Sequence, residues 1–181
     1  MTEPVLRRPR RIVTGHDAEG RSIFVQDGPA PNLIQPQASP NVGMFNLWTM
    51  AQVPASYAGN DDAAPAEARI TLAPALGGIN FRIMEFPPDA ERNWAGKQSV
   101  FAQYGNPEAL TDRAQRHPGF HKTDSIDFGI VLEGEIWALM DVGETLMQPG
   151  DVLIQRGTNH AWANRTDKPA RMAFILISAQ P

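Results

Sequence analysis

Three histidines and an aspartate in the second half of the chain have the types and spacing of metal ligands or of acid–base catalysts. His117, His121 and Asp127 lie close together, and His160 follows later. Side chains alternate between the two faces of a strand, so His117, His121, Thr123 and Asp127 point the same way if this segment is extended. His160 would join them from a later strand that folds back beside the first.

Two imidazoles and a carboxylate that face one cavity form the 2-His-1-carboxylate set. This set holds Fe(II), Mn(II), Zn(II) or Ni(II) and leaves coordination positions open for a substrate. The predicted ligands are His121, Asp127 and His160, and His117 is conditional because Pro118-Gly119 interrupts the extended backbone. Without a metal, a desolvated carboxylate beside an imidazole has a shifted proton affinity and acts as a general base. Asp127 and His160 are therefore the predicted catalytic residues on either interpretation.

A run of short strands must bring these residues together. Apolar stretches separated by Gly-containing turns predict strands over residues 127–132, 135–141, 144–147, 151–155, 160–164 and 171–178. Short strands at this spacing are typical of a sandwich or barrel. Residues 137–140 and 172–177 are apolar on both faces, which indicates that both faces are covered. We therefore expect a homodimer.

The first half of the chain predicts peripheral structure. Residues 11–26 have the pattern of a hairpin, residues 27–40 that of an extended loop, and residues 45–50 and 77–86 alternate as strands. Between the strands, Asn106 as N-cap and Pro107 at the first position predict a short helix over residues 107–115. This helical insert would serve as a lid, an interface element or a plain connector. We assign residues 1–76 to an N-terminal arm with peripheral strands and residues 77–181 to a barrel, within one structural domain.

Two motifs in this region resemble those of the cupin superfamily. The first, G-x5-H-x-H-x(3,4)-E-x6-G, matches His121, Asp127 in the place of the glutamate, and Gly134, whereas Thr123 replaces the second histidine. The second, G-x5-P-x-G-x2-H-x3-N, matches at the residues Gly150, Gly157, His160 and Asn164, with Gln155 in place of the proline and a first interval one residue shorter. The resemblance covers roughly residues 77–178.

The resemblance implies an all-β fold, an antiparallel double-stranded β-helix or jelly-roll barrel with an N-terminal arm and a short helical insert. It implies at most His121, Asp127 and His160 as metal ligands, with His117 as a fourth, because the hydroxyl of Thr123 is a poor ligand for a first-row divalent ion. It does not specify the reaction, since cupins include dioxygenases, decarboxylases, isomerases, epimerases and binding modules.

Three further residues are candidates for substrate binding. Arg82, on a strand that would line the same cavity, can clamp a carboxylate bidentately, although a surface ion pair is an equal alternative. Trp137 or Trp162, together with Phe81 and Met140, would line the barrel mouth.

Composition narrows the class of protein. The chain has 181 residues, a formal net charge of -4 and no cysteine, which excludes disulfide scaffolds and thiolate chemistry. Its one basic cluster, Arg7, Arg8, Arg10 and Arg11, lies in a Pro-containing tail that we interpret as a solvated arm, so we expect no nucleic-acid partner. No stretch of about 18 apolar residues is present to span a bilayer, and the N-terminus lacks an apolar signal segment. We expect a cytoplasmic protein without a membrane partner.

The function expected first is metal-assisted turnover of a small carboxylate- or enol-bearing molecule by decarboxylation, isomerisation or oxygenation. The second hypothesis is a metal-free proton-transfer enzyme with a carboxylate or histidine base. The third is a non-catalytic module that binds a small ligand.

Overall fold

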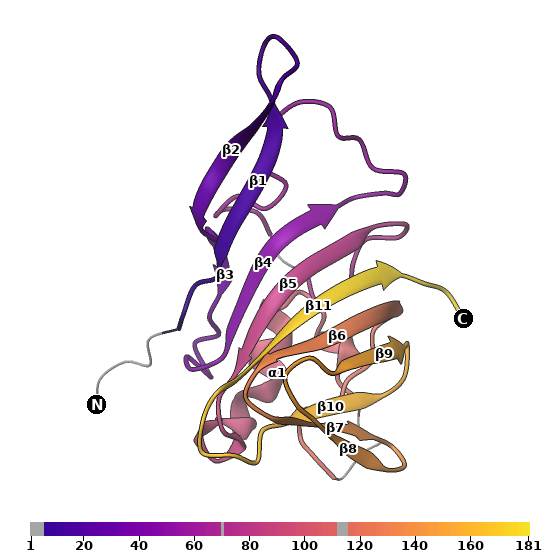
Figure 1. The fold of residues 1–181 in the computed structure, drawn as a ribbon. Coiled ribbons are helices and arrows are strands. Elements are labelled where there is room, and N and C mark those ends of the chain that lie inside the picture. The colour runs from indigo at the N-terminus through magenta and orange to yellow at the C-terminus, as the bar shows by residue number, and fades with distance from the viewer. Residues whose placement is uncertain (1–5, 70, 112–115) are drawn as a thin grey trace.

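Two facing β-sheets and a separate hairpin make up most of the molecule (Figure 1). The computed structural model describes residues 6–69, 71–111 and 116–181. The strands are β1 (Arg10–His16), β2 (Ser22–Pro29), β3 (Asn32–Ile34), β4 (Gly43–Met50), β5 (Ile79–Phe86), β6 (Ser125–Glu133), β7 (Ile136–Met140), β8 (Glu144–Met147), β9 (Val152–Arg156), β10 (His160–Ala163) and β11 (Ala170–Ser178). One sheet has the order β3-β4-β5-β11-β6-β9, the other has the order β10-β7-β8, and β1 pairs with β2.

All of these pairings are antiparallel, and the two larger sheets enclose a core between them. The predicted all-β jelly-roll barrel with a short helical insert is therefore confirmed. The strands of the second half lie within two residues of their predicted bounds, because alternating apolar residues and glycine turns specify them locally. Gly134, for example, has φ +72° in the turn after β6, where a Cβ atom would lie 2.8 Å from the carbonyl oxygen of Pro169.

Strand alternation decides which side chains reach the barrel interior. On β6, Asp127, Gly129 and Val131 point inward, and the residues between them point to the outer face of the large sheet. The inner apolar side chains of β6, β7, β10 and β11 pack together as the main core, which includes Val131, Ile136, Ala138, Trp162, Met172, Phe174 and Leu176. The barrel interior is thus apolar apart from the few polar side chains at one end.

The N-terminal region contributes directly to the large sheet. β3 pairs with β4, and β4 pairs with β5. Residues 27–40 were expected to form an extended loop, but they contain the strand β3. The amide of Asn32, which is 1% exposed, stabilises β3 by donating to the carbonyl oxygens of Pro65 and Ala68. Sequence pattern missed this strand because such side-chain to backbone bonds join segments that are distant in the chain. The division at residue 76 stays a prediction.

The basic cluster is not a free cationic arm. Arg7 pairs with Glu133, Arg10 with Asp27 and Arg11 with Asp62. Arg11 is buried, and its guanidinium bonds both carboxylate oxygens of Asp62, at 2.9 and 2.5 Å. This ion pair ties the β1-β2 hairpin to the loop that follows β4, which corrects the interpretation of a solvated arm.

The insert between β5 and β6 contains a helix, but not at the expected place. Its helix α1 runs over Lys97–Gln103, and the predicted helix is limited to a 3₁₀ turn at Pro107–Ala109. Leu110 has ψ 136° and pairs with His121, so the chain becomes extended there, and residues 112–115 lie outside the described residues. α1 forms because Val100 and Phe101 pack on the large sheet, a tertiary contact that capping residues do not encode. Within the described residues, no helix has the length and apolarity needed to cross a membrane.

Asn164, the last matched residue of the second motif, has a structural role, and we expect its replacement to lower the stability of the protein. It is 1% exposed, its amide donates to the carbonyl oxygens of Phe86 (2.9 Å) and Lys168 (2.8 Å), and its oxygen accepts from the amide of Thr166. We expect Asn164→Ala to lower the free energy of unfolding by about 2–4 kcal/mol, because buried polar groups lose their partners. Urea unfolding would measure this, and Asn159→Ala, nearer the surface, is the control. An equal effect of both variants would contradict this role.

Candidate active site

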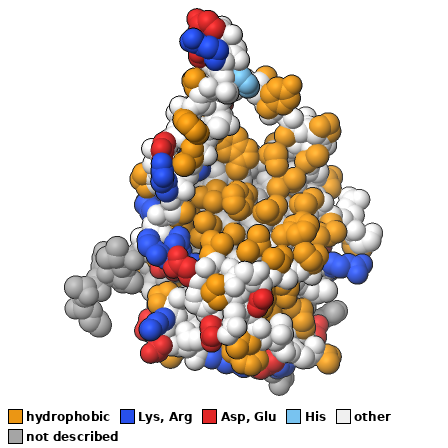
Figure 2. Space-filling model, viewed as in Figure 1, with side chains coloured by type: hydrophobic (Ala, Val, Ile, Leu, Met, Phe, Trp, Pro, Cys, Tyr) orange, Lys and Arg blue, Asp and Glu red, His pale blue; other side chains and the backbone are white. Residues whose placement is uncertain are grey.

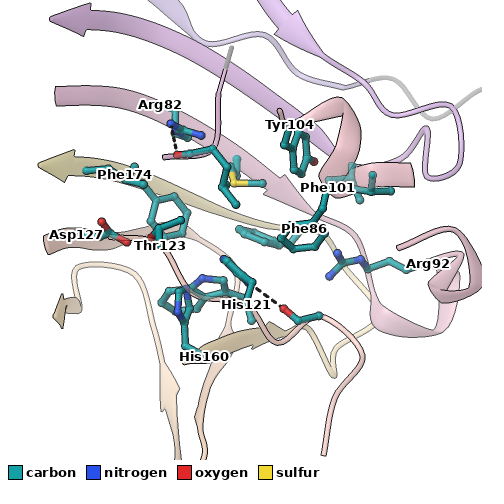
Figure 3. Close-up of a pocket in the computed structure, with 17 residues that line it drawn as sticks. Arg82, Phe86, Arg92, Phe101, Tyr104, His121, Thr123, Asp127, His160 and Phe174 are labelled. Atoms are coloured by element: carbon teal, nitrogen blue, oxygen red, sulfur yellow. Dashed lines mark hydrogen bonds between the residues drawn. The ribbon is translucent and has the colours of Figure 1, made fainter. Parts of the chain in front are cut away.

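One small cavity lies at the end of the barrel between the main core and the insert (Figure 3). Its volume is about 60 Å³. Aromatic rings form much of its wall, namely Phe86, Phe101, Trp162 and Phe174. The polar side chains that line it are Arg82, Arg92, Tyr104, His121, Thr123, Asp127 and His160. The three residues that sequence favoured as ligands therefore all reach a single cavity.

His121 and His160 form a close pair on one wall. Their backbones exchange two hydrogen bonds, at 2.8 and 3.0 Å, which places both rings on the same face with centroids 4.3 Å apart. The Nδ1 atom of His121 lies 2.9 Å from the carbonyl oxygen of Gly119, and that of His160 lies 3.0 Å from the carbonyl oxygen of Thr158. Because a carbonyl oxygen only accepts, each Nδ1 carries the proton and each Nε2 keeps a lone pair.

Burial keeps both imidazoles neutral. It lowers the pKa of His121 to about 4, with a further contribution from the positive charge of Arg92. Burial also lowers the pKa of His160 well below its usual value, and the neighbouring His121 adds to this effect. At neutral pH the pair therefore offers two hydrogen-bond acceptors, and no imidazolium donor, to a bound molecule.

Asp127 approaches the cavity from the opposite sheet. The chain leaves the small sheet at His121 and enters the large sheet at Ser125, so the two residues do not share one strand. Asp127 is 5% exposed, and its Oδ1 atom has no hydrogen-bond partner among the described residues. Burial raises the pKa of Asp127 to about 6, against the opposing effects of the Ser125 hydroxyl and the charge of Arg82. A carboxylate in this state binds a proton more readily than an exposed one.

The donor set does not fit the predicted metal centre. In the ranges that the structure describes, no three His, Asp or Glu side chains lie close enough together to hold a metal ion. The hydroxyl of Thr123, at the position of the second motif histidine, is hydrogen-bonded to Ser125 at 2.8 Å. The two imidazoles come from the small sheet and the carboxylate from the large one, because the extended strand does not continue through residues 122–124. The structure thus does not assemble His121, Asp127 and His160 as three ligands of one ion.

His117, the conditional fourth ligand, lies outside the cavity lining. Its Nε2 atom is 3.1 Å from Oδ2 of Asp89, and its Nδ1 atom accepts from the backbone amide of Gly119. Its ring also contacts Trp94, edge to face, with centroids 4.6 Å apart. Pro118-Gly119 does turn the chain here, so His117 supports the insert instead of joining the other histidines.

Of the three candidate substrate-binding residues, two line the cavity and one does not. Trp162 lines the cavity because it lies two residues after His160 on β10 and shares its face. Trp137 lies on the other face of β7 with Phe120 and Leu139, and Arg165 stacks on its ring, so its expected position at the barrel mouth is corrected.

Arg82 lines the cavity but is committed to the fold. It is 1% exposed and donates to the carbonyl oxygens of Thr71 and Leu72, both at 2.9 Å, which rules out the surface ion pair. Burial lowers its pKa to about 10, so it still carries its charge at neutral pH. Phe81 points to the outer face of the large sheet, and Met140 packs against the main core.

Among the polar residues of the cavity, the sequence did not indicate Arg92 and Tyr104, which the insert supplies. Tyr104 follows α1 and shares a face with Val100 and Phe101. The spacing of these three residues is the one local signal that could have indicated a buried turn of helix. Nothing in the sequence around Arg92 marks it as buried.

Comparison with known proteins identifies the family of the chain. A family model described as a cupin domain matches residues 110–177. The chain is 31% identical to phomopsin biosynthesis cluster protein C' of Diaporthe leptostromiformis, and the match covers 98% of this chain and 82% of that protein. It is 30% identical to the cupin-domain-containing oxidoreductase srdB of Neurospora crassa, over 98% of this chain and 78% of the relative.

A further relative has a similar name. The cupin-domain-containing oxidoreductase fogC of Aspergillus ruber is 30% identical and matches 95% of this chain and 73% of its own length. Among solved structures, a cupin 2 conserved barrel domain protein of Salinispora arenicola is 13% identical, with a TM-score of 0.41 over 82% of each chain.

Proposed function

Since this chain belongs to the cupin superfamily, we propose that it is an enzyme that moves a proton on a small organic molecule, with Asp127 as the general base. The observation that carries the proposal is the buried Asp127 carboxylate, whose Oδ1 atom has no partner in the described part of the chain and which lies in a cavity that two neutral imidazoles also line. A base is most useful when its pKa lies near the working pH, and the pKa of Asp127 is raised to about 6.

The proposed step is enolisation. Asp127 takes the proton from a carbon next to a carbonyl group, the electrons of the broken C–H bond form a C=C bond, and the π electrons of the carbonyl group move to its oxygen. The protonated Asp127 then returns the proton to that oxygen or to another carbon, which completes an isomerisation without loss of atoms. The Nε2 lone pairs of His121 and His160 accept hydrogen bonds from a hydroxyl group of the substrate and orient it.

This chemistry is compatible with the names of the relatives. Several are called oxidoreductases, and an isomerisation through an enediol oxidises one carbon while it reduces the neighbouring one. Such an internal transfer needs proton movements alone and no external electron acceptor. We therefore propose a keto–enol or related isomerisation in preference to the decarboxylation and oxygenation that the sequence also left open.

A metal has no step in this proposal, although proteins of the cupin fold commonly bind one. We expect chelator-treated protein to retain its full rate of enolisation, because the donors of the described residues do not form a three-ligand set. The measurement is deuterium incorporation from D₂O into phenylpyruvate, an enolisable acid with an aromatic ring, alongside elemental analysis of the same sample. Stoichiometric metal, with activity lost on chelation and restored by one ion, would instead support the metal-assisted mechanism. Thermal stabilisation by ligands without any exchange would favour a binding module.

The outer face of the large sheet supports the proposed homodimer. Figure 2 shows apolar side chains gathered over this face, where Val152 and Ile154 on β9 are 54% and 50% exposed. We expect light scattering to give twice the chain mass of 19.9 kDa for the wild type and the single mass for Ile154→Lys, because a charge on a packed apolar face is costly. Val142→Lys, in an exposed turn, is the control and should remain dimeric. A monomeric wild type would contradict the proposal.

A further inference from the structure

The insert presents buried hydrogen-bond donors that the proton transfer does not use. Tyr104 is 3% exposed, and its hydroxyl group has no hydrogen-bond partner among the described residues. Burial raises the pKa of Tyr104 to about 12, so the hydroxyl keeps its proton. The Nε atom of Arg92 is also buried without a partner in the described part of the chain. Both residues line the cavity, so their free donors point to a ligand that accepts hydrogen bonds there.

The guanidinium group of Arg92 is held in place by an aromatic ring and by a long ion pair with Asp89. Its Cζ atom lies 3.9 Å from the centre of the Trp94 ring, which fixes the plane of the group and leaves its edge free. The nearest carboxylate oxygen, Oδ1 of Asp89, is 3.7 Å from Nη1, which is longer than a hydrogen bond. Asp89 in turn contacts His117 at 3.1 Å. This arrangement positions Arg92 and keeps it able to form a closer pair with a ligand.

The charged side chains that line the cavity are mostly cationic. Two guanidinium groups, those of Arg82 and Arg92, line it together with a single carboxylate, Asp127, while both histidines are neutral. Asp89, which forms the long ion pair with Arg92, does not line the cavity. Arg82 donates hydrogen bonds to the carbonyl oxygens of Thr71 and Leu72. Arg92 is therefore the guanidinium group that is more available to bind a ligand. Figure 3 shows Arg92 and Asp127 on opposite sides of the cavity, with the histidine pair between them. An anionic group at Arg92 would therefore be kept apart from the base.

We infer that Arg92 and Tyr104 determine specificity by binding the carboxylate of the substrate, which makes the substrate a small carboxylic acid with an aromatic or other apolar body. The inference rests on the proposed function for the role of Asp127 at the other end of the cavity. The rings of Phe86, Phe101 and Trp162 contact the apolar body. An uncharged analogue would leave buried donors unpaired, and sites with buried polar groups discriminate strongly against such analogues.

The test compares two ligands of nearly the same shape, 3-phenylpropanoate and 3-phenylpropanamide, by calorimetric titration. We expect the wild type to bind the carboxylate about 10- to 100-fold more tightly, the range for hydrogen bonds to a charged group. Arg92→Met should abolish the preference, and Tyr104→Phe should reduce it. Arg92→Lys keeps the charge and loses the planar fork, so it should retain part of the preference even if the methionine variant folds poorly.

Arg165→Met is the matched control, because Arg165 also stacks on a tryptophan, Trp137 at 4.8 Å, but lies outside the cavity lining. It should bind both ligands as the wild type does. An equal affinity of the wild type for the two ligands, or an unchanged preference in both Arg92 variants, would overturn the inference. Asp127→Asn separates the two proposals, since it should keep the carboxylate preference while it loses deuterium exchange. A carboxylate preference in a wild type without exchange would leave the inference standing and refute the proposed function.

Discussion

Replacement of Asp127 by asparagine is expected to slow enolisation by a factor of about 10²–10⁴, the usual contribution of a positioned general base. The amide has nearly the shape of the carboxylate but does not accept a proton. In the wild type, kcat/KM should rise with pH through the pKa of Asp127, about 6, and level off above it, because only the ionised carboxylate is a base. The rise should be absent in Asp127→Asn. Deuterium exchange measured across this pH range gives both results.

Ser125→Ala is a second test of Asp127, because it should change the pKa of Asp127 without removing the carboxylate. The hydroxyl of Ser125 lowers the pKa of Asp127, so its removal should move the rise in kcat/KM to higher pH and keep the plateau. A structural role for Asp127 alone does not predict such a shift. Exchange by Asp127→Asn within a few-fold of the wild-type rate would show that the base is another group.

The second large effect is that Asp127→Asn stabilises the protein at neutral pH. The pKa of Asp127 is near 3.8 in the unfolded chain and about 6 in the folded one, so the folded state holds the proton more tightly between these values. Stability therefore falls as pH rises from about 4 to 6, and the full cost remains at higher pH. The cost is about 3 kcal/mol at about 1.4 kcal/mol per pH unit, since the side chain is almost fully buried.

Urea unfolding of both proteins from pH 4 to pH 8 measures this effect as a difference. The gap should grow by about 3 kcal/mol as pH rises through this range, which corresponds to roughly 6–12 °C in Tm for a chain of this size. The lowered pKa values of His121 and His160 have the opposite sign, because they reduce stability as pH falls below about 6.5. They act on both proteins and cancel in the difference. Asp167→Asn, at an exposed bend, is the control, and a gap independent of pH would contradict the prediction.

Residues of functional sites commonly lower the stability of the fold while they are needed for activity, and both effects are expected of Asp127. Asn164 is the contrasting case, since it belongs to the same pair of motifs but all its described contacts are with backbone and side-chain groups of the fold. Its substitution should cost stability, whereas that of Asp127 should increase it. The two variants therefore separate the structural from the chemical residues of the motifs.

The sequence by itself determined the barrel and most of its strands. Alternation of apolar side chains and turn glycines are local properties, and they specify β6 to β11 without reference to distant residues. The matched motifs also identified His121, Asp127 and His160, which all reach one cavity. Trp162 could be placed with His160, since two residues apart on a strand share a face.

Only the tertiary structure decided how these residues face one another. The parity of side chains holds within one continuous strand, and the chain crosses between sheets from His121 to Ser125, so His121 and Asp127 reach the cavity from different sheets. The same limit explains why Arg92 and Tyr104 were missed. Their burial depends on the packing of the insert against the large sheet, which is a contact between distant segments. The only local signal for it is the spacing of Tyr104 from Val100 and Phe101, and Arg92 has none.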